Sequence, residues 1–175
     1  MNRMVDFEQI ISELAREFDG ERQAEEREEV AELAEAELVS ATISDRLRGA
    51  EGRRIKAYSA FNVSASGLVV RVNPAWVLLQ QEDGQELVSA AAIALVEGLY
   101  KVAPEPSLVE KRLGLAHILR KIMRERRRVA VRAGAHLLSG FIGAVYADHV
   151  DIVHEAGVTS VALPHLFSVK LLRGY

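Results

Sequence analysis

The sequence predicts a mainly β protein with helices, of the α+β class, in which N-terminal helices precede two similar β units that are each led by a helix. Three observations support this prediction. Residues 66–99 align without a gap on residues 139–172 after a shift of 73 positions, and nine of the 34 aligned residues are identical. Both copies alternate apolar and polar residues in short runs, which is typical of strands. Apolar residues at helical spacing precede each copy.

The residues that are identical in the two copies are mostly Val, Leu and Gly, which are common in strands and in the turns between them. The nine identical pairs are Ser66/Ser139, Gly67/Gly140, Val72/Val145, Val77/Val150, Glu82/Glu155, Gly84/Gly157, Val88/Val161, Val96/Val169 and Leu99/Leu172. A repeat of this length indicates a duplicated supersecondary unit. Units this small bury little apolar area, so we expect the two copies to pack on each other or on a second chain.

The repeat and the composition together divide the chain. The prolines at positions 104 and 106 mark a linker between the two units. The predicted divisions are an acidic helical segment (1–41), a first repeat (42–100), a linker (101–107) and a second helix-plus-strand repeat (108–175).

An amphipathic helix is predicted from about residue 5 to residue 18. Its apolar stripe consists of Phe7, Ile10, Ile11, Leu14 and Phe18. Such a stripe either covers the core, joins two copies of the chain or binds a foreign partner, and covering or dimerisation is favoured. A second, weaker stripe falls in residues 30–41.

The first repeat begins with a short helix after Thr42, because Thr42 and Asp45 have the spacing of a capping box. A stop is expected at Gly49 or Gly52. Five strands follow, at 54–60, 67–72, 76–81, 86–89 and 93–97. The dipeptides Asn73-Pro74 and Asp83-Gly84 supply turns between them.

The second repeat begins with a longer helix. Ser107 and Glu110 form a capping-box pattern that predicts a helix to about residue 125. Its strands are predicted at 128–133, 138–145, 149–154, 159–163 and 166–172.

A helix followed by five short strands resembles the Sm-like barrel. Counting from Gly67, the apolar Val69, Val72, Val77 and Leu79 occupy the inward positions of the first Sm motif, and Asn73 stands at its usual Asp. The second copy repeats the series with Gly140, Ile142, Val145, Val150 and Ile152, and Tyr146 stands at the Asp position. The resemblance implies two tandem Sm-like or SH3-like five-stranded barrels, each led by a helix.

The second Sm motif departs from the RNA-binding members of that family. Those members use a polar or basic residue where this chain has Ser89-Ala90 and Ala162-Leu163. The departure counts against an RNA pocket in a ring lumen. The whole chain also resembles actinobacterial proteins of similar length that are labelled Fis-type transcriptional regulators, although residues 138–172 have strand periodicity where that label requires a helix-turn-helix.

The net charge of −3 conceals two opposite poles. Residues 1–51 carry fifteen acids and six bases, whereas residues 111–132 carry nine bases and one acid. A basic helix and its exit predict contact with the phosphates of RNA or DNA. The candidate residues are Lys111, Arg112, Arg120, Lys121, Arg124, Arg126, Arg127 and Arg128.

Two other interpretations of this basic segment stay open. Cations in a final helical turn favour the negative end of the helix dipole without any partner. In the other interpretation, acidic residues near the N-terminus lie against the basic ones, within the chain or across a dimer, and mask them. The acids in question are Glu25, Glu26, Glu28, Glu29, Glu32 and Glu35.

Two further groups of side chains are candidates for an interface and for a metal site. Trp76 and Leu78 alternate with inward residues, so they are predicted to face out of the first barrel and to form an interface with a helix, the other repeat or a partner. His149 and Asp151 share one face of a strand while His154 faces the other, so no metal site is predicted.

The chain contains no cysteine, no nucleophile motif and no glycine-rich phosphate loop. We therefore expect a non-enzymatic cytoplasmic protein without a cofactor, a metal, a small-molecule ligand or a membrane partner. The predicted function is nucleic-acid binding or transcription regulation through the basic helix. The alternative is a protein-interaction module that assembles as a homodimer or higher oligomer.

Overall fold

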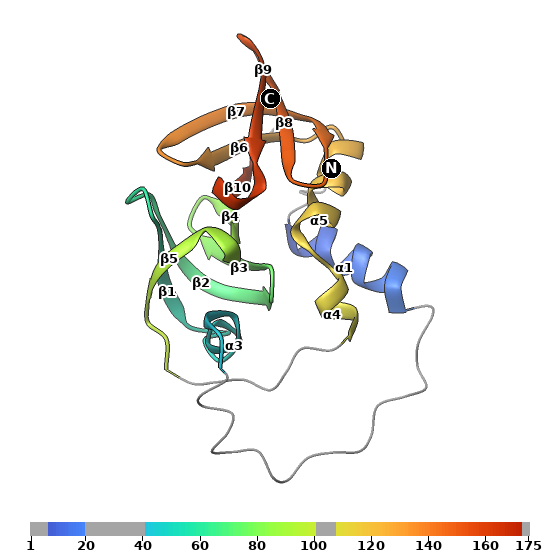
Figure 1. The fold of residues 1–175 in the computed structure, drawn as a ribbon. Helices are drawn as coiled ribbons and strands as arrows, with labels where there is room; N and C mark the ends of the chain where they lie inside the picture. Colours follow the sequence, from blue (N-terminus) through green and yellow to red (C-terminus); the bar gives the residue numbers. More distant parts are fainter. Residues whose placement is uncertain (1–6, 20–40, 101–107, 173–175) are drawn as a thin grey trace.

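The computed structural model of this chain describes residues 7–19, 41–100 and 108–172 (Figure 1). The strands of these residues form one open antiparallel sheet in the order β5-β1-β2-β3-β4-β10-β6-β7-β8-β9. The first half of the sheet contains β1 (Arg54–Ser59), β2 (Ser64–Asn73), β3 (Trp76–Gln81), β4 (Gly84–Ser89) and β5 (Ile93–Glu97). The second half contains β6 (Arg128–Ala133), β7 (His136–Val145), β8 (His149–His154), β9 (Gly157–Ala162) and β10 (Leu166–Leu171).

The prediction of two closed five-stranded barrels, each led by a helix, is wrong. Closing the first half on itself would require its outer strands, β4 and β5, to pair. Instead β4 pairs with β10, and β5 and β9 end the sheet. The reason is physical: a strand edge carries unpaired N–H and C=O groups, and β10 satisfies those of β4. Apolar periodicity locates strands but does not decide which edges join.

The 73-residue spacing of the sequence recurs in the elements. β3 and β8, β4 and β9, and the 3₁₀ turns η1 (Ala90–Ala92) and η2 (Leu163–His165) begin and end 73 positions apart. The β2–β3 pairing shifts register between Val69 and Arg71, and the β7–β8 pairing shifts between Ile142 and Ala144, again 73 positions on. Each half therefore has the same internal strand order.

The described helices are α1 (Phe7–Asp19), α3 (Ile43–Arg48), α4 (Leu108–Arg112) and α5 (Leu115–Arg124). The capping box of α3 is present, since Thr42 Oγ1 accepts from Asp45 N at 3.2 Å and Thr42 N donates to Asp45 Oδ2 at 2.7 Å. The single helix predicted to residue 125 is wrong, because Gly114 takes an extended conformation between α4 and α5. Ser107 and residues 30–40 of the weaker stripe at 30–41 lie outside the described residues.

Two apolar clusters form the interior. The first lies inside the first half under α3, and it includes Phe167 contributed by β10. The second joins the interior of the second half to α1, α5 and the outer face of β3 and β4. These helices lie together on one side of the sheet (Figure 1). Burial of each large apolar side chain stabilises the fold by about 1.5–3 kcal/mol.

None of the described helices has the length and apolar content that crossing a membrane would need.

Candidate nucleic-acid interface

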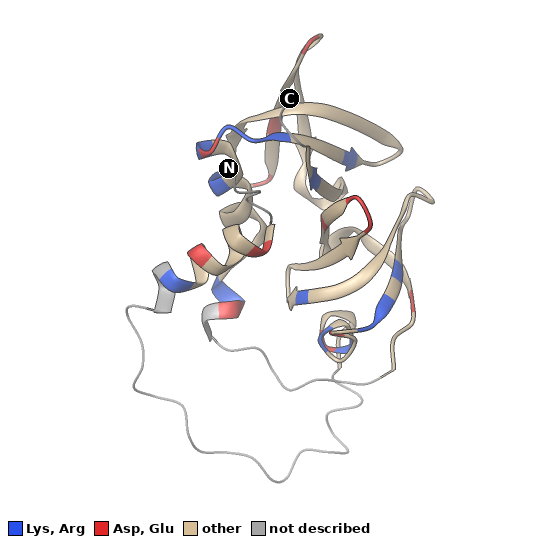
Figure 2. Ribbon diagram, turned by 180° about the vertical axis from the view of Figure 1, so that it is seen from behind, with Lys and Arg blue, Asp and Glu red and all other residues tan. Residues whose placement is uncertain are grey.

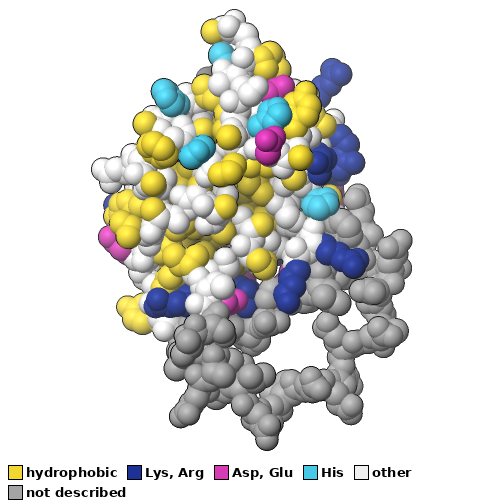
Figure 3. All heavy atoms as spheres, viewed as in Figure 1, with side chains coloured by type: hydrophobic (Ala, Val, Ile, Leu, Met, Phe, Trp, Pro, Cys, Tyr) yellow, Lys and Arg dark blue, Asp and Glu magenta, His cyan; other side chains and the backbone are white. Residues whose placement is uncertain are grey.

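The predicted basic residues lie on α4, on α5, in the turn that follows α5 and at the first residue of β6. Figure 2 shows Lys and Arg along α5 and the chain that leaves it, and Figure 3 shows such side chains on the side of the molecule where α5 lies. Lys121 and Arg127 are half-buried. The exposed members of the set are Lys111, Arg112, Arg120, Arg124, Arg126 and Arg128.

Lys121 has a structural role. Its Nζ lies 3.1 Å from Glu13 of α1 and 3.3 Å from Glu125. The hydrogen bond with Glu13 raises the pKa of Lys121, and the same bond lowers the pKa of Glu13. Lys121 therefore ties α5 to α1. Within the described part of the chain, ion pairs do not include Arg120, Arg124, Arg126 or Arg128.

The helix α5 ends in a left-handed cap at Arg126. Arg126 has a φ of +51°, its N–H donates to Met123 O at 3.0 Å, and Arg127 N–H donates to Ile122 O at 3.2 Å. This is the left-handed helix cap that normally carries glycine, and a residue with a Cβ costs about 1 kcal/mol there. The chain thus places an arginine where stability favours glycine, a feature that residue spacing alone did not reveal.

The predicted interface residues of α1 are used within the chain. Phe7, Ile10, Ile11 and Leu14 are buried in the second apolar cluster. The side chain of Phe18 lies outside the described part of the structure. This stripe covers core in a single copy of the protein, and its proposed role in joining two copies is not needed to explain its apolar pattern.

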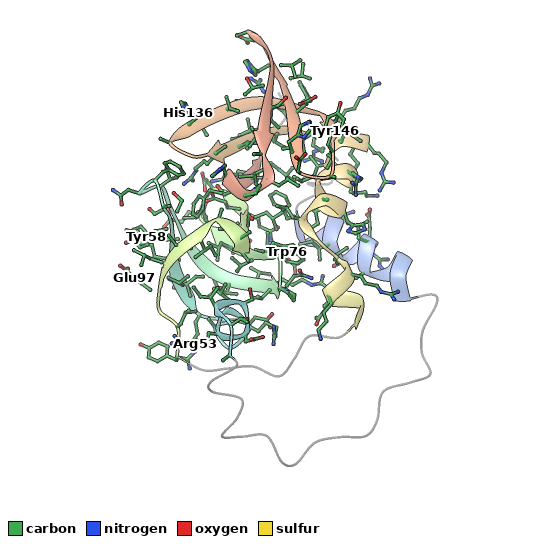
Figure 4. The ribbon with its side chains drawn as sticks, viewed as in Figure 1. Arg53, Tyr58, Trp76, Glu97, His136 and Tyr146 are labelled. Atoms are coloured by element: carbon green, nitrogen blue, oxygen red, sulfur yellow. The ribbon has the colours of Figure 1, made fainter. Side chains whose placement is uncertain are left out.

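Trp76 and Leu78 lie on the outer face of the first half, as predicted, and are covered by helices. Trp76 is 1% exposed, and its Nε1 donates to Leu113 O at 2.7 Å. Figure 4 shows Trp76 between the strands of the first half and the α4–α5 segment. Nearby, the Asn73 side-chain amide donates to Glu110 O, and Asn73 Oδ1 accepts from Ala75 N at 2.8 Å.

The polar residues of β8 each have a separate partner. The ring of His149 stacks on Tyr146 with centroids 4.3 Å apart, and its Nδ1 lies 2.6 Å from Asp148 Oδ1. This hydrogen bond lowers the pKa of Asp148. Asp151 accepts from Ser160, and His154 contacts Thr159. Among the described residues, no three His, Asp or Glu side chains converge as metal ligands would.

A groove of about 600 Å³ lies where equivalent turns of the two halves meet. Pro74 and Ala75 line it from the first half, and Ala147, Asp148 and Leu163 line it from the second. Its lining contains no Lys or Arg. The exposed arginines beside α5 are therefore better placed to receive a phosphate than this groove.

No family model matches the chain, and no curated protein matches its sequence. The resemblance to Sm-like proteins stays a prediction.

Proposed function

We propose that this protein is a non-enzymatic, cytoplasmic nucleic-acid-binding protein that contacts the phosphate backbone through Arg120, Arg124, Arg126 and Arg128. These four residues are termed the basic surface below. All four are exposed. The observation that carries the proposal is Arg126, which occupies a left-handed cap at a cost in stability and adds a cation to this surface.

The chemistry of the basic surface favours phosphate over base recognition. Guanidinium groups donate two hydrogen bonds to one phosphate and keep their charge at every physiological pH. Sequence-tolerant base binding uses stacked aromatic rings, and the exposed ring of Phe141 on β7 lies opposite Arg128 in the β6–β7 pairing, where it could stack on a base of any sequence. We therefore expect affinity that depends on salt and hardly on sequence.

The proposal is tested with fluorescent duplex DNA and single-stranded RNA of mixed sequence, titrated with protein over a series of salt concentrations. Changing all four arginines to Ala should abolish most binding at low salt and reduce the slope of log K against log salt by about 3. Arg54→Ala, at an exposed arginine of β1, is the matched control and should bind as the wild type does. Unchanged affinity in the fourfold variant would contradict the proposal.

Arg126→Gly separates binding from stability. Glycine suits the left-handed cap, so the free energy of unfolding of this variant should exceed that of the wild type by about 1 kcal/mol. It should also bind nucleic acid more weakly, because one phosphate contact is lost. A variant that is stabilised and binds equally well would show that Arg126 takes no part in the interface.

A further inference from the structure

The junction between the two halves is a strand pair with its own polar cluster. Across it, Ser168 pairs with Val88, Val169 with Leu87 and Lys170 with Glu86.

Glu86 is fully buried at this junction. Its carboxylate accepts from Ser168 Oγ at 2.6 Å, from Gln81 Nε2 at 2.8 Å and from Arg132, whose nearest nitrogen is 3.1 Å away. Because partners from both halves satisfy it, the pairing of β4 with β10 is a specific contact.

The two ends of the sheet carry the same two kinds of edge. A shift of 73 residues places β4 on β9 and places the start of β5 on the start of β10. In the described residues β9 pairs only with β8, and β5 pairs only with β1. Neither free strand contains Pro or Lys, the residues that commonly protect a sheet edge from further pairing. One molecule therefore presents a β4-type edge at one end and a β10-type edge at the other.

The side chains of β5 are exposed at positions that β10 buries. Leu95 is 65% exposed, whereas the equivalent Ser168 is 1% exposed. Ala94 is exposed, whereas the equivalent Phe167 is fully buried. Figure 4 shows Tyr58 and Glu97 together at this outer side of the first half, and Tyr58 Oη donates to Glu97 at 3.2 Å.

We propose that β9 of one molecule pairs with β5 of a second copy of this chain, antiparallel and in the register of the β4–β10 junction. That register sets Leu95 opposite Val161, Val96 opposite Ser160 and Glu97 opposite Thr159. The contact joins two different edges, so copies add head to tail and form either a ring or an open chain. It involves no residue of the basic surface and does not depend on the proposed function.

The mass of the full chain in solution, measured by light scattering over a concentration series, tests the pairing. The wild type should exceed the 19.3 kDa of one chain as concentration rises. Leu95→Lys should return the mass to that of one chain, because the pairing would bury an unpaired charge. Leu137→Lys is the matched control: Leu137 is 67% exposed on β7, which is not an end strand, and the variant should assemble as the wild type does.

A charge exchange tests the register. Thr159→Glu places a carboxylate opposite Glu97 and should remove assembly, since like charges directly opposite destabilise a strand pair. Adding Glu97→Lys to this variant sets a lysine directly opposite the new carboxylate, as Lys170 lies opposite Glu86 in the register of the internal junction, and should restore assembly. Circular dichroism of each variant checks that it is folded.

Three results would overturn the proposal: a wild type that stays at 19.3 kDa at every concentration, a Leu95→Lys variant that still assembles, or a folded double variant that remains a single chain. Loss of nucleic-acid binding with assembly intact would affect only the basic surface.

Discussion

The outer faces of the two halves have the same strands and opposite chemistry. In the first half, Trp76, Leu78 and Leu87 are buried beneath the helices. The positions 73 residues later carry His149, Asp151 and Ser160, which are at least partly exposed and where Ser160 donates to Asp151 at 2.6 Å. The outer face of the first half is therefore apolar and covered by helices, whereas the equivalent face of the second half is polar and at least partly exposed.

The basic helix α5 packs against both halves. α5 precedes β6 in the chain, yet it packs in one apolar cluster with Trp76, Leu78 and Leu87 of the first half. The same cluster includes Ile142 and Val150 of the second half, and α5 packs on β7, so both halves position the helix on which Arg120 and Arg124 are exposed. An equivalent helix could not dock on β8 and β9 in the same way, because burying Asp151 would cost several kcal/mol without a cationic partner.

The largest expected effect comes from Trp76. Trp76→Ala should lower the free energy of unfolding by about 4 kcal/mol, because it empties a large volume in the core and leaves Leu113 O without its donor. His149→Ala, at the equivalent position, should change it by less than about 0.5 kcal/mol. Urea unfolding followed by circular dichroism measures both. Similar losses for the two variants would show that both outer faces are covered.

The junction should be the next most sensitive place. Glu86→Ala removes the acceptor for Arg132 and Ser168 and should cost about 3 kcal/mol, at the low end for a buried pair because Arg132 keeps some access to water. Thr159→Ala, at the matching position of the free edge, should cost at most about 1 kcal/mol. The comparison is made by urea unfolding at low protein concentration. Equal costs at the two positions would mean that the halves are not held together by this cluster.

Gly67 and Gly140 should respond alike, because here the halves agree. A Cβ on Gly67 would lie 2.5 Å from Gln80 O, and one on Gly140 would lie 2.1 Å from Val153 O. Backbone oxygens cannot move aside as a flexible side chain can, so alanine at either position should cost about 2 kcal/mol. Thermal unfolding of both variants checks this. If alanine were neutral at only one of the two glycines, β2 and β7 would not approach their neighbouring strands in the same way.

The sequence predicted the positions of the strands well and their closure wrongly. β3, β5, β6 and β8 begin and end where the alternation of apolar residues places them. That alternation depends on which face of a strand is buried, a local property. The pairing of β4 with β10 depends on which of several similar edges is nearest after the chain has folded, and periodicity carries no information on that choice.

The sequence predicted which residues make up the candidate site, but not how their side chains are paired or how the backbone places them. Clustered arginines were visible in the sequence, but Lys121 proved to be paired with Glu13. Charge counting cannot separate a paired cation from an exposed one. The left-handed cap at Arg126 was missed because the usual signal for it, glycine, is absent.

The smallest expected effect concerns the contact that holds α1 against α5 on the covered outer face. The pKa of Glu13 lies below its ordinary value of 4.5 because Lys121 donates a hydrogen bond to it. A lowered pKa means that the contact stabilises the folded protein above the ordinary pKa, and that this contribution is lost as the pH falls through the folded value. Glu13→Gln should therefore be slightly less stable than the wild type at pH 7, near the limit of detection for a solvent-exposed pair.

The pH and salt dependence of that small difference are more informative than its size. The gap between Glu13→Gln and the wild type should close once Glu13 is protonated in both folded and unfolded chains, and it should shrink at high salt. Glu155→Gln, at an exposed position of the β8–β9 turn, should show no such gap. If instead the gap persisted in acid, the stabilising contact of Glu13 would not be its charge, and the link between α1 and the basic helix would rest on the apolar stripe alone.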